Sequence, residues 1–249
     1  MKGNYSIHKA LILCLIGYAN IGSAQQSIEW VFDGGPTWFD VSRSTLASTD
    51  IETDFLSKGH ADTTGELGLS VYYKRSLLLN GSAWFNTLGI GLALRYSGFS
   101  DKIATGNVYQ FEQANLDNYH YKLYFENTRL LAQLSLDVLT YKQVSLYLMG
   151  GIGEGWSRLG YHDVPNVMGL GGGLFLAKEN TSRVVGDVGV GFNYHHTTHL
   201  AYSLSYLYTA YGHIAASNHG YLNGEPAQVI GPSLSIDSHA LLVGIHYLA

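Results

Sequence analysis

The chain has 249 residues, of which 46% are hydrophobic and 13% are charged, about half the charged fraction of an ordinary soluble domain. Beyond the N-terminus it contains no run of about 18 apolar residues, which excludes a helical membrane protein. Its 19 acidic residues against 14 Lys and Arg argue against a nucleic-acid partner. Nineteen Tyr, 30 Gly and only four Pro favour strands over helices, so an all-β chain is expected.

The first 24 residues have the features of a cleaved signal peptide. Two lysines precede a short apolar stretch, and Gly22 and Ala24 supply the small residues of a cleavage site. The single cysteine, Cys14, lies inside this segment. We therefore expect residues 1–24 to be removed and residues 25–249 to form the mature domain, with 12 Lys and Arg, 19 acids and no thiol chemistry.

Alternation with a period of two residues predicts eight strands in the mature chain. In each strand, large apolar residues alternate with Gly, Ser, Thr or charged residues, as Leu67, Leu69 and Val71 alternate with Gly68 and Ser70. This pattern indicates lipid on one face and a small packed interior on the other. The predicted strands cover residues 28–41, 66–74, 87–97, 129–138, 144–153, 184–194, 200–208 and 238–248.

The predicted connections alternate between short and long. The short ones are 76–82, 140–143 and 195–198, and the long ones are 42–64, 98–121, 158–182 and 210–236. Short turns at one end and long loops at the other are typical of an eight-stranded antiparallel transmembrane β-barrel with periplasmic turns and extracellular loops. We assign the ambiguous segment 167–177 to the third long loop, as a ribbon that continues the wall above the membrane; an extra strand is the alternative.

Aromatic residues gather at both ends of the predicted strands, where the headgroup layers of a membrane would lie. Those near the short turns are Tyr73, Trp84, Phe85, Tyr141, Phe192, Tyr194 and Tyr247. Those near the long loops are Trp38, Tyr96, Trp156, Tyr206 and Tyr208. Two such girdles favour a membrane-spanning barrel over a soluble one.

Two stretches carry a resemblance to a known family. Residues 188–212 (VGVGFNYHHTTHLAYSLSYLYTAYG) form a glycine-spaced strand, a short turn and a Tyr-rich strand, and residues 243–249 (VGIHYLA) place Gly three residues before an aromatic. In these features the chain resembles the eight-stranded outer-membrane barrels, namely the OmpA membrane domain, OmpX-like proteins and opacity-type surface proteins. It departs from them at Ala249, where the family usually ends in Phe. The resemblance implies a location in the cell outer membrane, with its lipid and the barrel-assembly machinery as partners.

Seven charged residues fall on the predicted inner face, where an eight-stranded barrel is filled by side chains. They are Asp33, Glu66, Lys74, Arg95, Arg129, Asp137 and Asp187. Because unpaired buried charges are costly, we expect a lumenal ion network in which Arg95 and Arg129, on adjacent strands, pair with Asp33, Glu66 and Asp187. Such a network either plugs the barrel or lines a narrow, gated pore for small solutes.

Two other groups of residues suggest a metal site and a hydrolase motif, but neither has the arrangement that such a site needs. His195, His196 and His199 crowd one predicted turn, but side chains in such a turn point apart, which does not suit metal ligation. Residues 217–220 (SNHG) look superficially like part of a lipid-hydrolase motif, but Ala215 stands where those enzymes have His, and the segment lies in a long loop. We predict no catalytic residue, no metal site and no cofactor.

The long loops are polar and rich in tyrosine, which suits contact with other molecules as well as plain solvation. The loop tyrosines are Tyr109, Tyr119, Tyr121, Tyr211 and Tyr221. Binding residues are often carried on loops that a rigid scaffold presents. The sequence thus favours a non-enzymatic surface protein that adheres to a host or surface ligand, with a small-solute channel as the alternative and a lipid hydrolase as the third hypothesis.

Overall fold

The computed structural model describes residues 26–42, 44–47, 53–77, 84–99, 102–113, 115–167 and 172–249. The expected signal peptide, residues 1–24, lies outside this part. The barrel strands are β1 (Gln26–Val41), β5 (Thr63–Ser76), β6 (Trp84–Ser97), β8 (Asp117–Tyr141), β9 (Val144–Pro165), β10 (Leu174–His195), β11 (Leu200–Ala215) and β14 (Ser233–Leu248). The remaining elements are β2 (Ser44–Ala47), β3 (Thr53–Leu56), β4 (His60–Ala61), β7 (Ala104–Tyr109), the 3-10 turn η1 (Gln110–Glu112), β12 (His219–Leu222) and β13 (Glu225–Gln228).

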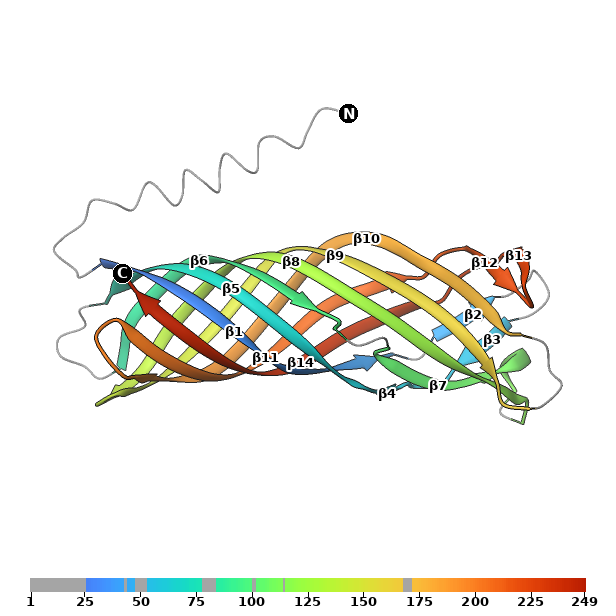
Figure 1. Ribbon diagram of the computed structural model, residues 1–249, viewed down its shortest axis with the longest axis horizontal. Helices are drawn as coiled ribbons and strands as arrows, with labels where there is room; N and C mark the ends of the chain where they lie inside the picture. The colour runs from blue at the N-terminus through green and yellow to red at the C-terminus, as the bar shows by residue number, and fades with distance from the viewer. Residues whose placement is uncertain are drawn as a thin grey trace, which may run out of the picture.

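Eight strands form a closed ring in the order β1, β5, β6, β8, β9, β10, β11 and β14 (Figure 1). Every neighbouring pair is antiparallel, and β1 closes the ring because it pairs with β14 on one side and β5 on the other. Gly34, for example, lies between Val243 and Leu67. Closure satisfies the backbone hydrogen bonds that lipid cannot satisfy. The predicted eight-stranded antiparallel barrel is confirmed.

The two ends of the barrel differ. At one end, two residues join β8 to β9, four join β10 to β11, and the amide of Ala249 donates to Ile28 O at 2.8 Å. The other end carries β2, β3, β7, β12 and β13 (Figure 1). No helix in the described part of the chain is long and apolar enough to cross a membrane.

Three of the predicted long loops were too long. The fourth, 210–236, covers only 216–232, because β11 runs to Ala215 and β14 begins at Ser233. β9 runs to Pro165 and β10 begins at Leu174, so the third connection covers only 166–173 instead of 158–182. Of the ambiguous segment 167–177, the last four residues begin β10, whereas 168–171 lie outside the described residues. β8 likewise begins at Asp117, inside the predicted loop 98–121. In each case the strand continues after its apolar-outside pattern has stopped.

A belt of exposed apolar side chains surrounds the ring. Leu134 and Ile152, for instance, face outward and are 55% and 63% exposed. An apolar surface this continuous requires lipid around it. At the short-turn end, Tyr73, Phe85, Tyr141, Phe192, Tyr194 and Tyr247 are exposed, and at the other end Trp38, Trp156 and Tyr206 are exposed. The belt and its aromatic margins identify the membrane-spanning zone.

Beyond the belt, the polarity of the wall inverts without any break in the strands. Along β8, the inward side chains change from Gln133 and Arg129 to Phe125 and Leu123, all of them buried. Over the same stretch the outward side chains change from leucines to Glu126. The inward apolar residues form one cluster, which we call the cap core: Phe39, Val41, Leu56, Ile103, Ala104, Val108, Tyr121, Leu123, Phe125, Leu159, Tyr161, Leu174, Leu176, Val185, Tyr211, Ile214, Ala216, Val229, Leu234 and Ile236. The extracellular half of the barrel is therefore packed like a water-soluble protein.

Above the membrane, the barrel wall opens between β10 and β11. The two strands pair from His195↔Ala201 up to Gly186↔Ala210. On this side of β10, ladder pairing resumes only where Leu174–Leu176 meets β12. Among the described residues, no ladder partner from β11 or β12 faces residues 177–185. A bulge at Gly212, whose φ is +74°, turns β11 away from β10 at this point. We call this opening the β10–β11 slit.

Candidate functional site

The structure brings the five residues of the predicted lumenal ion network together inside the membrane-spanning zone. The Arg95 guanidinium donates to both carboxylate oxygens of Asp33 at 2.9 Å and reaches Glu66 Oε1 at 3.4 Å. Arg129 Nη2 donates to the same Glu66 oxygen at 2.5 Å. Arg95 Nε lies 4.0 Å from Asp187 Oδ2. All five side chains are buried, and Glu66 bridges two arginines that are direct cross-strand neighbours.

Two glycines make room for this network. Gly68 stands between Asp33 and Arg95 on the neighbouring strands, and a Cβ there would lie 2.3 Å from Asp33 Oδ1 and 2.8 Å from Arg95 Nη1. A Cβ on Gly151 would lie 2.5 Å from Asp187 Oδ1. Gly68 thus leaves space for the Asp33–Arg95 ion pair, and Gly151 leaves space for Asp187.

Neutral side chains extend the network across the lumen. Tyr72 donates to Gln133 Oε1 at 2.6 Å, and Gln133 donates in turn to Asp187 Oδ2 at 2.9 Å. On the extracellular side, Arg129 Nη1 donates to the Tyr211 hydroxyl at 3.2 Å, and its guanidinium carbon lies 5.7 Å from the centre of the Tyr211 ring. Tyr211 also belongs to the cap core, so it joins the charged and apolar parts of the interior.

A second ion cluster lies toward the short turns, and the sequence argument did not assemble it. Lys74 Nζ lies 2.9 Å from Glu29 Oε2 and 3.9 Å from Asp137 Oδ2, and His246 Nδ1 lies 3.1 Å from Glu29 Oε1. The sequence had placed Lys74 and Asp137 on the inner face, and both are buried there, but it did not include Glu29, which shares the inward parity of Asp33 on β1. His246 carried no comparable signal, because the alternation of residues along a strand does not show whether a histidine is charged and needs an acidic partner.

Little free space remains between these clusters. A cavity of about 10 Å³ lies among Asp33, Lys74, Arg95, Tyr147 and His246, and this volume corresponds to about one water molecule. A cluster of buried apolar residues adjoins this cavity and fills the neighbouring space: Tyr147, Met149, Leu207, Ala240 and Leu242. The interior of the membrane-spanning zone is filled by side chains.

A buried acid lies beside the cap core, outside the membrane. Asp163, near the end of β9, is 6% exposed, and burial raises the pKa of its carboxyl to about 7. The buried carboxylate of Asp54 also raises the Asp163 pKa by charge repulsion, whereas the Tyr161 hydroxyl and the Leu174 amide act in the opposite direction. Asp163 is therefore a buried acid of the extracellular end whose charge changes near neutral pH.

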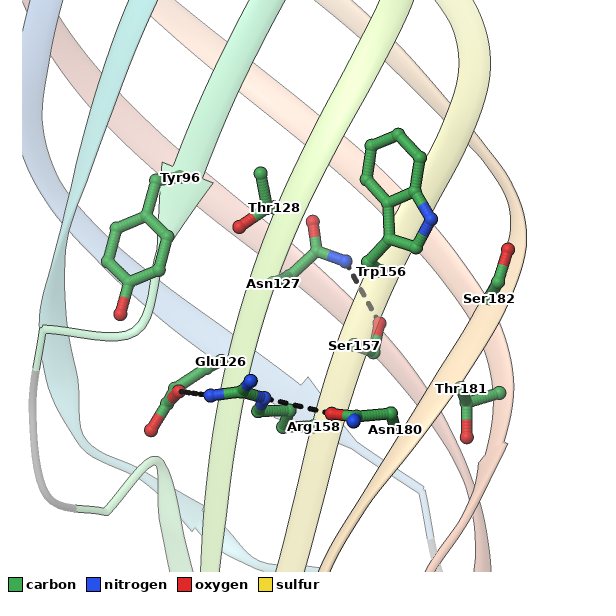
Figure 2. A pocket seen from close by; sticks show the side chains of 10 residues that line it. All are labelled: Tyr96, Glu126, Asn127, Thr128, Trp156, Ser157, Arg158, Asn180, Thr181 and Ser182. Carbon is green, nitrogen blue, oxygen red and sulfur yellow. Dashed lines mark hydrogen bonds and ion pairs between the residues drawn. The ribbon is translucent and has the colours of Figure 1, made fainter.

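On the outside of the wall, a groove of about 470 Å³ crosses β8, β9 and β10 just beyond the aromatic margin (Figure 2). Its floor is the sheet itself, where the inward-facing Asn127 donates to Ser157 Oγ at 2.9 Å. Its outward lining residues are Tyr96, Glu126, Thr128, Trp156, Arg158, Asn180 and Ser182. Sequence reasoning missed this groove because its residues fell within or beside predicted loops.

The three turn histidines and the segment 217–220, considered above for metal binding and hydrolysis, contact nearby side chains and backbone atoms. His195 Nε2 lies 2.9 Å from Ser145 Oγ, His199 Nδ1 lies 3.0 Å from Leu248 O, and the His196 ring packs against Tyr202. Among the residues that the structure describes, no group of three or more His, Cys, Asp or Glu could hold a metal ion. In the segment 217–220, Ser217 Oγ accepts the amide of His219 at 3.1 Å and Asn218 Oδ1 accepts that of Gly231.

Three of the tyrosines assigned to loops lie in barrel strands. Tyr119 and Tyr121 belong to β8 and Tyr211 to β11, and the rings of Tyr121 and Tyr211 are buried in the cap core. The assignment of these three residues to loops was wrong, because the strands continue above the membrane, where the inverted polarity turns Tyr121 and Tyr211 inward. Tyr109 ends β7, and Tyr221 is exposed on β12.

No family model and no curated protein matches the chain. Solved structures do resemble it. Neisserial surface protein A is 13% identical with a TM-score of 0.46 (90% of this chain, 98% of that one), and OprG of Pseudomonas aeruginosa is 16% identical with a TM-score of 0.49 (90% and 97%). Ail of Yersinia pestis, an attachment invasion locus protein, is 13% identical with a TM-score of 0.38 (89% and 98%). By its closed ring, apolar belt and short turns at one end, the chain has the fold of an eight-stranded antiparallel transmembrane β-barrel, the architecture of these outer-membrane proteins.

Proposed function

We propose that the protein is a non-enzymatic surface protein of the outer membrane, closed to solute flow, which binds a host or surface ligand through its extracellular end. The observation that carries this proposal is the double filling of the interior. Ion pairs and hydrogen bonds occupy the membrane-spanning zone, and the cap core occupies the lumen above it. A small-solute pore would require a continuous aqueous path through both layers.

The extracellular end offers fixed apolar contact residues. Phe111 is 52% exposed and is held at a φ of +52°, where its amide donates to the buried carboxylate of Asp54 at 3.1 Å. Tyr221 and Ile230 are also exposed at this end. Exposed aromatic side chains with little freedom lose little entropy on binding, which makes them effective contact residues.

Conductance measurements test the closed interior. The purified protein in a planar lipid bilayer is expected to give no steady current, both as the wild type and after Arg129→Ala, because the cap core remains. A steady current through the wild type that Arg129→Ala abolishes or enlarges would establish the alternative function, a gated pore.

Surface binding tests the role of the extracellular end. Bacteria that display the protein are expected to bind host cells or matrix less after Phe111→Ala or Tyr221→Ala. The matched control is Phe85→Ala, because Phe85 is similarly exposed at a φ of +54° but lies at the short-turn end. Equal adhesion by all these variants and by a strain without the protein would refute the adhesive role.

A further inference from the structure

The outer groove lies where a membrane barrel meets the headgroups of the outer leaflet. Its membrane side is formed by Tyr96 and Trp156, aromatic residues at the margin of the apolar belt. Its extracellular side is formed by Glu126, Arg158 and Asn180 (Figure 2). The groove opens sideways from the wall, so in a membrane it faces neighbouring lipid molecules rather than the extracellular medium.

Two cations in and beside the groove are held by the same carboxylate. Lys178 donates to Glu126 Oε1, and Arg158 Nη1 lies 3.9 Å from Glu126 Oε2. Arg158 Nε donates to Asn180 Oδ1 at 2.8 Å (Figure 2). Both cationic side chains remain about half exposed, at 59% and 46%. Since a guanidinium has five N–H donors and an ammonium three, most of their donors stay available to an anion.

The charge of this face contrasts with that of the chain. The protein carries a net charge of −5, yet Lys122, Arg158 and Lys178 project from the outer face of β8–β10 above the belt, close to Glu126 and Glu154. Elsewhere at the extracellular end, Lys58 pairs with Asp40 at 3.2 Å and Lys102 with Asp62 at 3.1 Å. The outer face of β8–β10 is thus suited to an anionic neighbour.

We propose that the groove binds the phosphorylated saccharide headgroup of an outer-leaflet glycolipid. Arg158 and Lys178 bind a phosphate, because a planar guanidinium and an ammonium together match its oxygens. Asn180, Ser182 and Thr128 offer amide and hydroxyl groups to the sugar hydroxyls. The ring of Trp156 lies at the boundary between saccharide and acyl chains, where an amphipathic ring is most stable.

The test uses the whole protein in maltoside micelles, titrated with bisphosphorylated diglucosamine lipid (lipid A), with binding followed by native mass spectrometry. The variant Arg158→Gln/Lys178→Gln is expected to bind at least 10-fold more weakly. The control variant Lys58→Gln/Lys102→Gln, which removes the same charge from the other cations, is expected to change affinity less than 2-fold. Both substitutions lie on the exposed surface, and unchanged circular dichroism shows that the barrel is intact.

Two further ligands separate the chemistry of the headgroup from charge alone. Dephosphorylated lipid A should bind the wild type no better than lipid A binds the double variant, and phosphatidic acid, a phosphate without sugar, should bind at least 10-fold more weakly than lipid A. Equal affinity of the two variants for lipid A, or equal affinity of the wild type for phosphatidic acid and lipid A, would overturn the proposal.

Discussion

At the scale of single residues, the lumenal network depends on Glu66, whose Oε1 atom contacts both Arg95 and Arg129. Removal of one partner from a buried ion pair leaves an uncompensated charge. We expect Glu66→Gln to lower the free energy of unfolding by about 3–5 kcal/mol. Urea titration of the barrel in lipid vesicles measures the change.

The control for this variant is an ion pair in water. Asp40→Asn breaks the exposed pair with Lys58 and should cost less than about 1 kcal/mol, because solvent screens such pairs. Equal stability of the Glu66→Gln variant and the wild type would show that the two arginines do not need the carboxylate.

A second residue-scale prediction concerns the pH dependence of the cap. The pKa of Asp163 is about 7 in the folded protein against an ordinary 3.8, so between these values the folded state holds a proton that the unfolded chain has lost. Stability therefore falls as pH rises from about 4 to about 7, by up to about 4 kcal/mol. Asp163→Asn, which keeps an acceptor but no charge, should remove this slope in urea titrations at several pH values. A slope of unchanged size in that variant would assign it to other groups.

The residue scale also shows what the sequence could reveal of the site. Parity along the strands places Asp33, Glu66, Arg95, Arg129 and Asp187 on one face, and buried charges must find partners, so their meeting was predictable. The groove was not predictable in this way, because Arg158 and Asn180 come together only if β9 and β10 continue beyond the apolar alternation. The partner of each charge depended on register, which parity does not supply.

At the scale of elements, the predicted strand centres agree with the structure and the predicted strand ends do not. Leu130 and Leu134 marked β8 correctly, but Tyr121 and Leu159 were placed in loops because their surroundings no longer alternate with apolar residues on the outside. Above the membrane, water replaces lipid, so apolar residues face inward and polar residues outward, while the alternation keeps its period of two residues. A search for period two in either polarity would have extended β8, β9 and β10.

The β10–β11 slit gives a prediction at the same scale. Residues 179–185 of β10 have a ladder partner only on the β9 side, and 177–178 lie at a register shift without a ladder partner, whereas residues 186–194 are paired on both sides. Amides without a ladder partner exchange with solvent more readily. Hydrogen–deuterium exchange in nanodiscs should thus label a peptide that covers 177–185 faster than one that covers 186–194. Equal rates would mean that the two strands pair along their whole length in the membrane.

At the scale of the whole molecule, the height of the apolar belt can be measured by charge substitution. Leu134→Arg places a cation in the middle of the belt and should cost about 2–4 kcal/mol, the penalty for arginine at the bilayer midplane. Ser182→Arg, at the cross-strand partner of Trp156 and so at the aromatic margin, should cost less than about 1 kcal/mol. Unfolding titrations in vesicles compare the two, and a similar cost at both positions would contradict the assigned membrane boundary.

The inversion of polarity along the wall means that two different solvents hold the two halves of this molecule together. The cap core gains its cohesion from excluding water, a driving force that carries a large heat capacity and weakens on cooling. The half within the bilayer has already left water and gains no such force from it. Near freezing, the extracellular half should loosen while the embedded half keeps its shape, so the temperature of the surroundings acts on one end of the barrel alone.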